Sequence, residues 1–69
     1  MKFENGKSYV FSKELYINDN DLDMNNKACK FAVETWVEEC DGKPVQFAND
    51  FIGYCYDYFI ISDWCKEVE

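Results

Sequence analysis

Cysteine is the residue type in this chain that is best suited to metal or redox chemistry. Ten, fourteen and nine residues separate the four cysteines in turn, which are Cys29, Cys40, Cys55 and Cys65. Four thiolates can close a tetrahedral zinc site, and cysteines can also pair as disulfides. However, no two of them have the short spacing of a zinc knuckle, and free cysteine is among the most buried residue types. The spacing therefore favours buried thiols, with disulfides and a zinc site as the alternatives.

A polar stretch of alternating carboxylate and amide side chains has the spacing with which a calcium-binding loop opens. It reads Asp19-x-Asp21-x-Asp23-x-Asn25. The pattern then fails, because Met24 stands where the sharp turn needs glycine and Lys30 stands where the bidentate glutamate belongs. We therefore expect a solvated acidic loop, and we predict no metal-binding and no cofactor-binding residue.

Catalytic residues are not predicted either. The chain has no histidine, so the commonest general base is missing. A cysteine nucleophile would need another base or a neighbouring cation to form its thiolate, and only Cys29 and Cys65 have a lysine next to them. We expect a protein that is not an enzyme.

The charge of the chain disfavours one class of function. Fourteen Asp and Glu residues against seven lysines give a net charge of −7, and arginine is absent. Proteins that bind nucleic acid neutralise its phosphates with cations, and arginine is the preferred contact. Direct binding of nucleic acid is therefore not expected, whereas an acidic chain suits a basic protein surface. The alternative is that the charge only keeps an apolar small domain in solution.

The start of the chain, Met1–Gly6, has no apolar core of a secretory signal, and no run approaches the ~18 apolar residues that a membrane span needs. We therefore expect a cytoplasmic protein without a membrane contact. Thiols stay reduced in the cytoplasm, which agrees with unpaired cysteines.

The densest apolar stretch, residues 51–65, must position much of the core. Aromatic and β-branched residues at this density predict a strand over residues 51–61. With a period of two, one face carries Ile52, Tyr54, Tyr56, Tyr58 and Ile60. The other face carries Phe51, Gly53, Cys55, Asp57, Phe59 and Ile61. We expect one face to enter the core and the other to lie under the chain ends or against a partner.

The other elements are predicted from local patterns. Ala28–Cys40 has two interpretations, a helix capped by Asn25 or Asn26 and a strand that ends in an Asp41-Gly42 hairpin; a short helix or helical turn is favoured. The remaining elements are a strand over Ser8–Ile17 with a break near Lys13-Glu14, a polar loop over Asn18–Lys27, a strand over Lys43–Phe47, a turn over Ala48–Asp50, a tight turn over Ser62–Cys65 and a frayed end over Lys66–Glu69.

These elements predict a single domain over residues 1–69 that is mainly β, in the α+β class, with one short helix or helical turn. After the first strand and the acidic loop, the chain reads Gly42-Lys43-x-Val45-x-Phe47, then Gly53-Tyr54, Ile60 and Trp64. This order is similar to that of small SH3-like barrel proteins encoded by phages and prophages. The resemblance implies a small SH3-like β-barrel, with a strongly bent antiparallel sheet as the alternative, and it implies no catalytic residues.

Charge, size and this resemblance together predict a small acidic binding protein from a phage or mobile element. We expect it to inhibit a host nucleic-acid-handling or defence protein, as anti-CRISPR inhibitors do, by occupying a basic groove. The residues expected to bind the partner, either as phosphate mimics or as tyrosine anchors, are Asp19, Asp21, Asp23, Glu34, Glu38, Glu39, Asp41, Tyr54, Tyr56 and Tyr58. The alternatives are half-buried tyrosines, a zinc-stapled module held by four cysteines, and a homo-oligomeric interaction domain.

Overall fold

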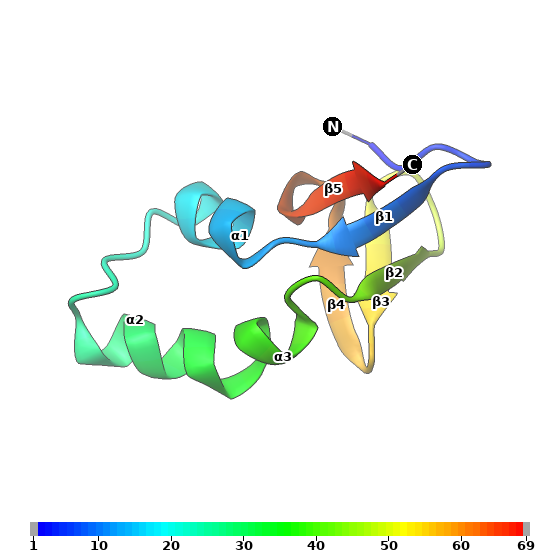
Figure 1. Ribbon diagram of the computed structural model, residues 1–69. Coiled ribbons are helices and arrows are strands. Elements are labelled where there is room, and N and C mark those ends of the chain that lie inside the picture. The colour runs from blue at the N-terminus through cyan, green and yellow to red at the C-terminus, as the bar shows by residue number, and fades with distance from the viewer. Residues whose placement is uncertain (1, 69) are drawn as a thin grey trace.

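The computed structural model describes residues 2–68 of the 69-residue chain. Its sheet has antiparallel strands in the spatial order β4-β3-β2-β1-β5 (Figure 1). The strands are β1 (Ser8–Phe11), β2 (Pro44–Phe47), β3 (Ile52–Cys55), β4 (Tyr58–Ile61) and β5 (Cys65–Val68). The protein is thus a small α+β protein, and the sheet is not closed into a barrel, because β4 and β5 remain its two edges. The closed SH3-like β-barrel that was expected is therefore not found.

A long helical connection joins β1 to β2. It contains α1 (Lys13–Asp19), α2 (Lys27–Ala32), the π-helical turn η1 (Val33–Val37) and α3 (Glu38–Cys40). We call residues 12–41 the helical arm. It extends away from the sheet in Figure 1 and gives the molecule extents of 39 × 21 × 19 Å. Within residues 2–68, no helix has the length and apolar character that a membrane crossing requires.

Helix α1 replaces the second half of a predicted strand. The Ser12 side chain caps it by accepting a hydrogen bond from the backbone N–H of Leu15 at 3.3 Å. Tyr16 then packs edge-on against Trp64 and Trp36, with ring centroids 4.7 and 5.1 Å away. The prediction of a strand that runs on to residue 17 is therefore wrong. The apolar residues of this short segment fit both the two-residue period of a strand and the 3.6-residue period of a helix. The Ser12 cap and the aromatic packing stabilise the helix.

The ambiguous segment is helical throughout. Asn26 caps it by accepting hydrogen bonds from the N–H groups of Ala28 and Cys29 at 2.9 and 3.3 Å. Its buried residues are Val33, Val37 and Cys40. The favoured helical interpretation is confirmed, although the helix is longer than expected. The segment ends at Gly42, whose φ of +75° suits glycine and whose N–H donates to the carbonyl of Phe11 at 2.8 Å.

Residues 51–61 form a hairpin instead of one strand. A two-residue turn at Tyr56 and Asp57 joins β3 to β4. In this register Tyr54 pairs with Phe59, Cys55 pairs with Tyr58, and Gly53 pairs with Ile60. Ile60 and Gly53 are buried and Phe59 is exposed, so the turn reverses which residues face the core. The prediction that Tyr54 shares a face with Ile60 is wrong, because Tyr54 pairs with the exposed Phe59, and Tyr56 lies in the turn. Tyr58 does share the inner face with Ile60, two residues further along β4.

The end of the chain is ordered through pairing. The predicted tight turn is the 3-10 helix η2 (Ser62–Trp64), and β5 follows it directly. Strand β5 pairs with β1 in a register that places Lys66 opposite Val10 and Val68 opposite Ser8. The prediction of a frayed end is therefore wrong for residues 66–68, while Glu69 lies outside the described residues.

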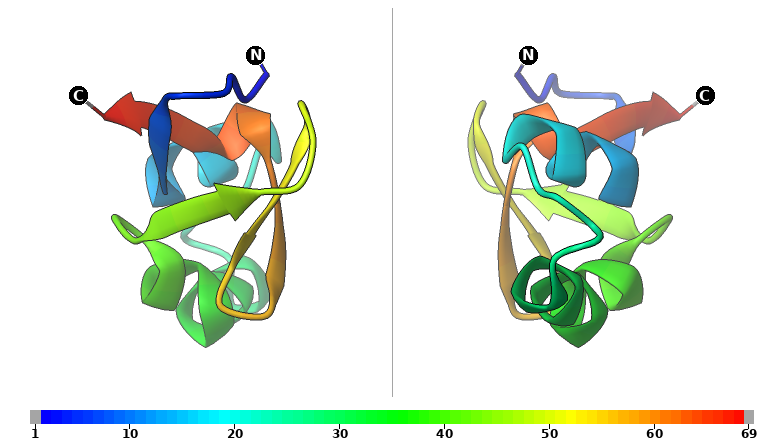
Figure 2. Two further views of the ribbon diagram at one scale, coloured as in Figure 1. Left: turned by 90° about the vertical axis from the view of Figure 1, so that its right-hand side faces the viewer. Right: turned by 90° about the vertical axis from the view of Figure 1, so that its left-hand side faces the viewer.

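The core has two aromatic groups. One lies where the chain start meets the sheet, with the Phe3 ring 5.0 Å from both Tyr9 and Phe47. The other joins the helical arm to the sheet, and we call it the aromatic cluster; its members are Phe11, Tyr16, Trp36, Tyr58 and Trp64. Figure 2 shows the β3–β4 hairpin beside the helix that carries Trp36, in agreement with a distance of 5.3 Å between the Trp36 and Tyr58 rings.

Candidate functional site

The helical arm carries most of the negative charge. Residues 12–41 hold eight of the fourteen Asp and Glu residues and three of the seven lysines, so they contribute −5 to the net charge of −7. The eight acids are Glu14, Asp19, Asp21, Asp23, Glu34, Glu38, Glu39 and Asp41. All eight are exposed. The charge is therefore concentrated on one structural unit.

Some of these carboxylates hold the arm in place. Asp19 Oδ2 accepts a hydrogen bond from Trp64 Nε1 at 2.8 Å, which connects the end of α1 to η2. Asp41 Oδ1 accepts from the backbone N–H of Lys13 at 2.9 Å, and Glu38 lies 3.6 Å from the Lys13 ammonium. Three of the predicted contact residues thus already have a structural role, which sequence reasoning did not assign to them.

Other carboxylates on the arm remain unpaired. Those of Asp21, Glu34 and Glu39 make no ion pair or hydrogen bond with another residue in the range 2–68. Asp23 accepts a hydrogen bond only from the nearby N–H of Asn25 at 2.9 Å. In the described part of the chain, no three His, Cys, Asp or Glu side chains approach closely enough to hold a metal ion. The acids are therefore spread along the arm as surface charge.

The cysteines are free thiols. Cys40 Sγ lies 3.9 Å from the carbonyl oxygen of Cys55, and Cys65 Sγ lies 3.7 Å from that of Ile61. Burial raises the pKa of the Cys40 and Cys65 thiols to about 12. A protonated, buried thiol is a poor nucleophile and a poor metal ligand. Within residues 2–68, the cysteines do not gather into a set of side chains that could hold a metal ion, so the alternative of a zinc-stapled module has no structural basis there.

A second candidate surface lies on the outer face of the β3–β4 hairpin. The rings of Tyr54 and Phe59 pack together there with centroids 5.1 Å apart, and the two side chains are 39% and 67% exposed. Tyr58, in contrast, is half-buried against Trp36. Sequence reasoning missed Phe59, because it took the hairpin for one strand. The signal that would have found it is Asp57, a residue that favours turns, in the middle of the apolar run.

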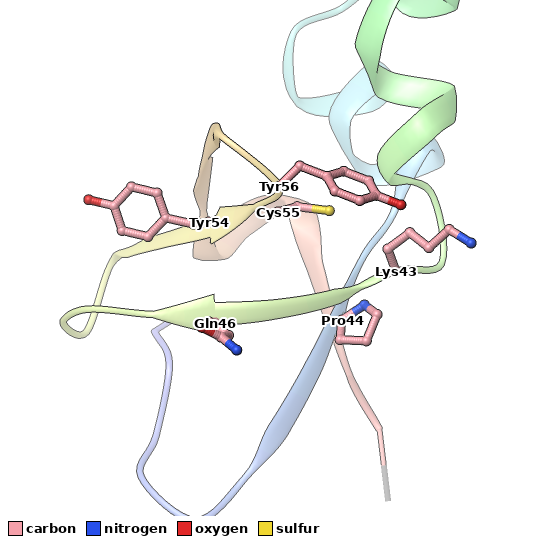
Figure 3. Close-up of a pocket in the computed structure, with 6 residues that line it drawn as sticks. All are labelled: Lys43, Pro44, Gln46, Tyr54, Cys55 and Tyr56. Atoms are coloured by element: carbon pink, nitrogen blue, oxygen red, sulfur yellow. The ribbon is translucent and has the colours of Figure 1, made fainter.

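A pocket of about 360 Å³ adjoins this surface (Figure 3). Its lining residues are Lys43, Pro44, Gln46, Tyr54, Cys55 and Tyr56. They come from β2 and the residue before it, and from the end of β3 with the turn that follows. In Figure 3 the Tyr56 ring points toward the Lys43 end of the pocket, and the Tyr54 ring points toward the opposite end.

The predicted contact residues therefore fall into separate places. Tyr54 and Tyr56 both line the pocket, and Tyr58 joins the aromatic cluster. The end of α3 lies against the pocket, since the Cys40 thiol contacts the carbonyl of the lining residue Cys55. This places the α3 acids nearer to the tyrosines than those of the loop between α1 and α2 (Figure 1). Comparisons with protein-family models, with curated proteins and with solved structures give no match for this chain.

Proposed function

We propose that this chain is a small acidic, non-enzymatic binding protein from a phage or mobile element. It inhibits a host nucleic-acid-handling or defence protein in the cytoplasm, as anti-CRISPR inhibitors do, by occupying a basic groove. The observation that carries the proposal is the concentration of charge on the helical arm, whose 30-residue span from 12 to 41 holds −5 of the net −7.

The distribution of charge supports mimicry of phosphates. Only one lysine of the arm, Lys13, pairs with an acid among residues 2–68, so the arm presents uncompensated negative charge. Glu34 and Glu38 stand one helical turn apart, and the helix presents such residues on the same side. A basic groove that normally holds a nucleic-acid backbone would meet a similar series of anions, and opposite potentials speed the encounter.

The topology supports the resemblance to phage-encoded SH3-like proteins. The strands follow the order β4-β3-β2-β1-β5, a long connection separates β1 from β2, and a 3-10 turn separates β4 from β5. In this proposal the sheet, which is open at β4 and β5, corresponds to the barrel of those proteins without its closure. The helical arm then occupies the position of the long loop that follows the first strand in SH3-like barrels.

The test compares two variants with the same change in charge. In Glu34→Lys/Glu39→Lys two unpaired carboxylates of the arm are reversed, and in Asp50→Lys/Glu67→Lys two exposed carboxylates outside it are reversed. Immobilised native chain and both variants are exposed to a bacterial lysate at low and at high ionic strength, and the captured proteins are identified by mass spectrometry.

We expect a nucleic-acid-binding protein to be captured by the native chain and by the variant changed outside the arm. High salt should abolish the capture, because exposed charges are screened beyond the Debye length. The arm variant should also abolish it, because two carboxylates that face the basic groove become cations. The purified target should then lose its binding or cleavage of nucleic acid when the native chain is added. Capture that is insensitive to salt and to the arm variant would contradict the proposal.

A further inference from the structure

We propose that the pocket between β2 and β3 receives an apolar side chain from an extended segment of the basic partner, with flanking arginine or lysine residues left outside. The partner's positive charge is taken from the proposed function. The place and the chemistry of the contact follow from the pairing of β2, the backbone of Tyr56 and the charges next to the lining residues.

The pocket arises because β2 changes its partner along its length. Pro44 and Val45 pair with β1, while Gln46 and Phe47 pair with β3. The pairing of β2 with β3 ends at the pair formed by Gln46 and Tyr54, so Pro44 and Val45 have no paired residue in β3. The residues on either side of this gap are the ones that line the pocket. The cavity is therefore built into the sheet, between two strands whose positions are held by their other neighbours.

Tyr56 adopts an unfavourable backbone conformation at this pocket. Its φ is +55°, in the left-handed region that a bulky L residue rarely occupies. Burial does not compensate, because the side chain is 60% exposed. Glycine and asparagine are the residues that hairpin turns of this kind favour. Strain of this sort gathers at ligand-binding positions, and here it presents an aromatic ring at the edge of the pocket.

The charged residues in and next to the pocket indicate the chemistry of the segment that it receives. Lys43 lines the pocket and opposes the entry of a bare cation. The lining segments are flanked in the chain by acids: exposed Asp41 lies two residues before Lys43, exposed Asp57 follows Tyr56, and exposed Glu39 precedes Cys40, whose thiol contacts the carbonyl of Cys55. An apolar side chain between cationic neighbours meets both conditions. A second copy of this chain does not, because it brings another charge of −7.

The probe is the peptide acetyl-Lys-Arg-Leu-Arg-Lys-amide, titrated into isotope-labelled protein and followed by NMR. One control peptide has alanine in place of leucine, and the other has glutamate in place of every cation. We expect the backbone amide signals of Lys43, Gln46, Cys55 and Tyr56 to shift with the first peptide. Both controls should bind at least about tenfold more weakly.

The matched variant is Tyr56→Asn, which suits the turn and removes the ring. We expect it to keep the native spectrum and to bind the leucine peptide at least about tenfold more weakly. The inference is overturned if the peptide shifts signals elsewhere, if the alanine peptide binds equally well, or if Tyr56→Asn leaves the affinity unchanged. It is also overturned if the pocket signals shift with protein concentration alone, which would identify a second copy as the occupant.

These results separate this inference from the proposed function. If the peptide occupies the pocket while capture from the lysate is insensitive to the arm variant, the pocket stands and the phosphate mimicry fails. If capture depends on the arm while the peptide shifts only signals of the arm, the mimicry stands and the pocket inference fails.

Discussion

The helical arm and the β3–β4 hairpin contribute opposite kinds of surface. The arm presents carboxylates, and neither α1 nor α2 contains a fully buried residue. The hairpin presents aromatic rings, and its inner positions Gly53, Cys55 and Ile60 are buried. The arm joins the core through the buried residues Val33, Val37 and Cys40 and through partly buried side chains such as Tyr16 and Trp36, whereas the hairpin is also held along its length by backbone pairing.

This difference shows how a small chain can separate binding from folding. Charged residues on the arm keep their hydration, so their number adds little to the cost of folding. The aromatic residues of the hairpin serve the core on one face and remain available on the other. Contacts of the arm should therefore be sensitive to salt, and contacts of the hairpin should be sensitive to the shape of its turn and its outer face.

The largest effect is expected from Phe11→Ala, which removes a ring from the aromatic cluster that connects the helical arm to the sheet. Phe11 is fully buried and contacts the rings of Trp36 and Trp64. Its loss should lower the free energy of unfolding by about 3–5 kcal/mol, which is a large part of the stability of a domain of this size. Urea unfolding followed by circular dichroism measures the change. The control Phe31→Ala, at a side chain that is 71% exposed on the same arm, should change it by less than about 0.5 kcal/mol.

The next effect concerns the packing of the hairpin against β2. A Cβ atom on Gly53 would lie 2.7 Å from Val45 Cγ1 and 3.1 Å from the carbonyl oxygen of Gln46. Gly53→Ala should therefore destabilise the protein by about 1–3 kcal/mol in the same unfolding measurement. The double variant with Val45→Ala removes the closest atom, so its cost should be smaller than the sum of the single costs. Additive costs would show that the close approach of Val45 to Gly53 does not matter.

A smaller effect of opposite sign is expected at the turn of the hairpin. Tyr56→Asn should stabilise the free protein by about 0.5–1 kcal/mol, because asparagine tolerates the left-handed conformation better than tyrosine. Thermal unfolding gives the change. Tyr54→Asn is the matched control, since this tyrosine lies in a strand against Phe59, and there asparagine should destabilise. A loss of stability with Tyr56→Asn would contradict the strain assigned to this turn.

The smallest effect concerns charges outside the arm. Lys7 Nζ lies 2.7 Å from Glu4 and 3.1 Å from Glu67, and its hydrogen bond and charge lower the pKa of the Glu4 carboxyl. A lowered pKa in the folded state stabilises above the ordinary pKa of glutamate, and this contribution is lost as the pH falls through the lowered value.

An NMR titration of the Glu4 side chain checks this assignment. Lys7→Met should return the pKa of Glu4 toward its ordinary value, and the melting temperature should hardly change because all partners are exposed. A Glu4 titration that is the same in both proteins would show that the pair does not form in solution.

Local chemistry was enough to predict several features. Asn26 caps its helix and Gly42 ends it, because each of these residue types suits a particular backbone geometry regardless of the rest of the chain. The net charge and the absence of histidine follow from composition alone. The strand at Pro44–Phe47 was also predicted nearly at its bounds, since the Asp41-Gly42 turn marks its start.

Only the tertiary structure decided the rest. Leu15 and Tyr16 satisfy a strand or a helix equally well, and contact with Trp36 and Trp64 selects the helix. Tyr56 is a poor turn residue and only its neighbour Asp57 favours a turn, so the local signal for a reversal is weak and the pairing of β3 with β4 decides it. Lys66 and Glu67 are charged, and residues 66–68 form a strand because β1 offers an open edge. In each case a contact distant in sequence outweighs a weak local preference, and it also determines which aromatic rings and which carboxylates remain free to meet a partner.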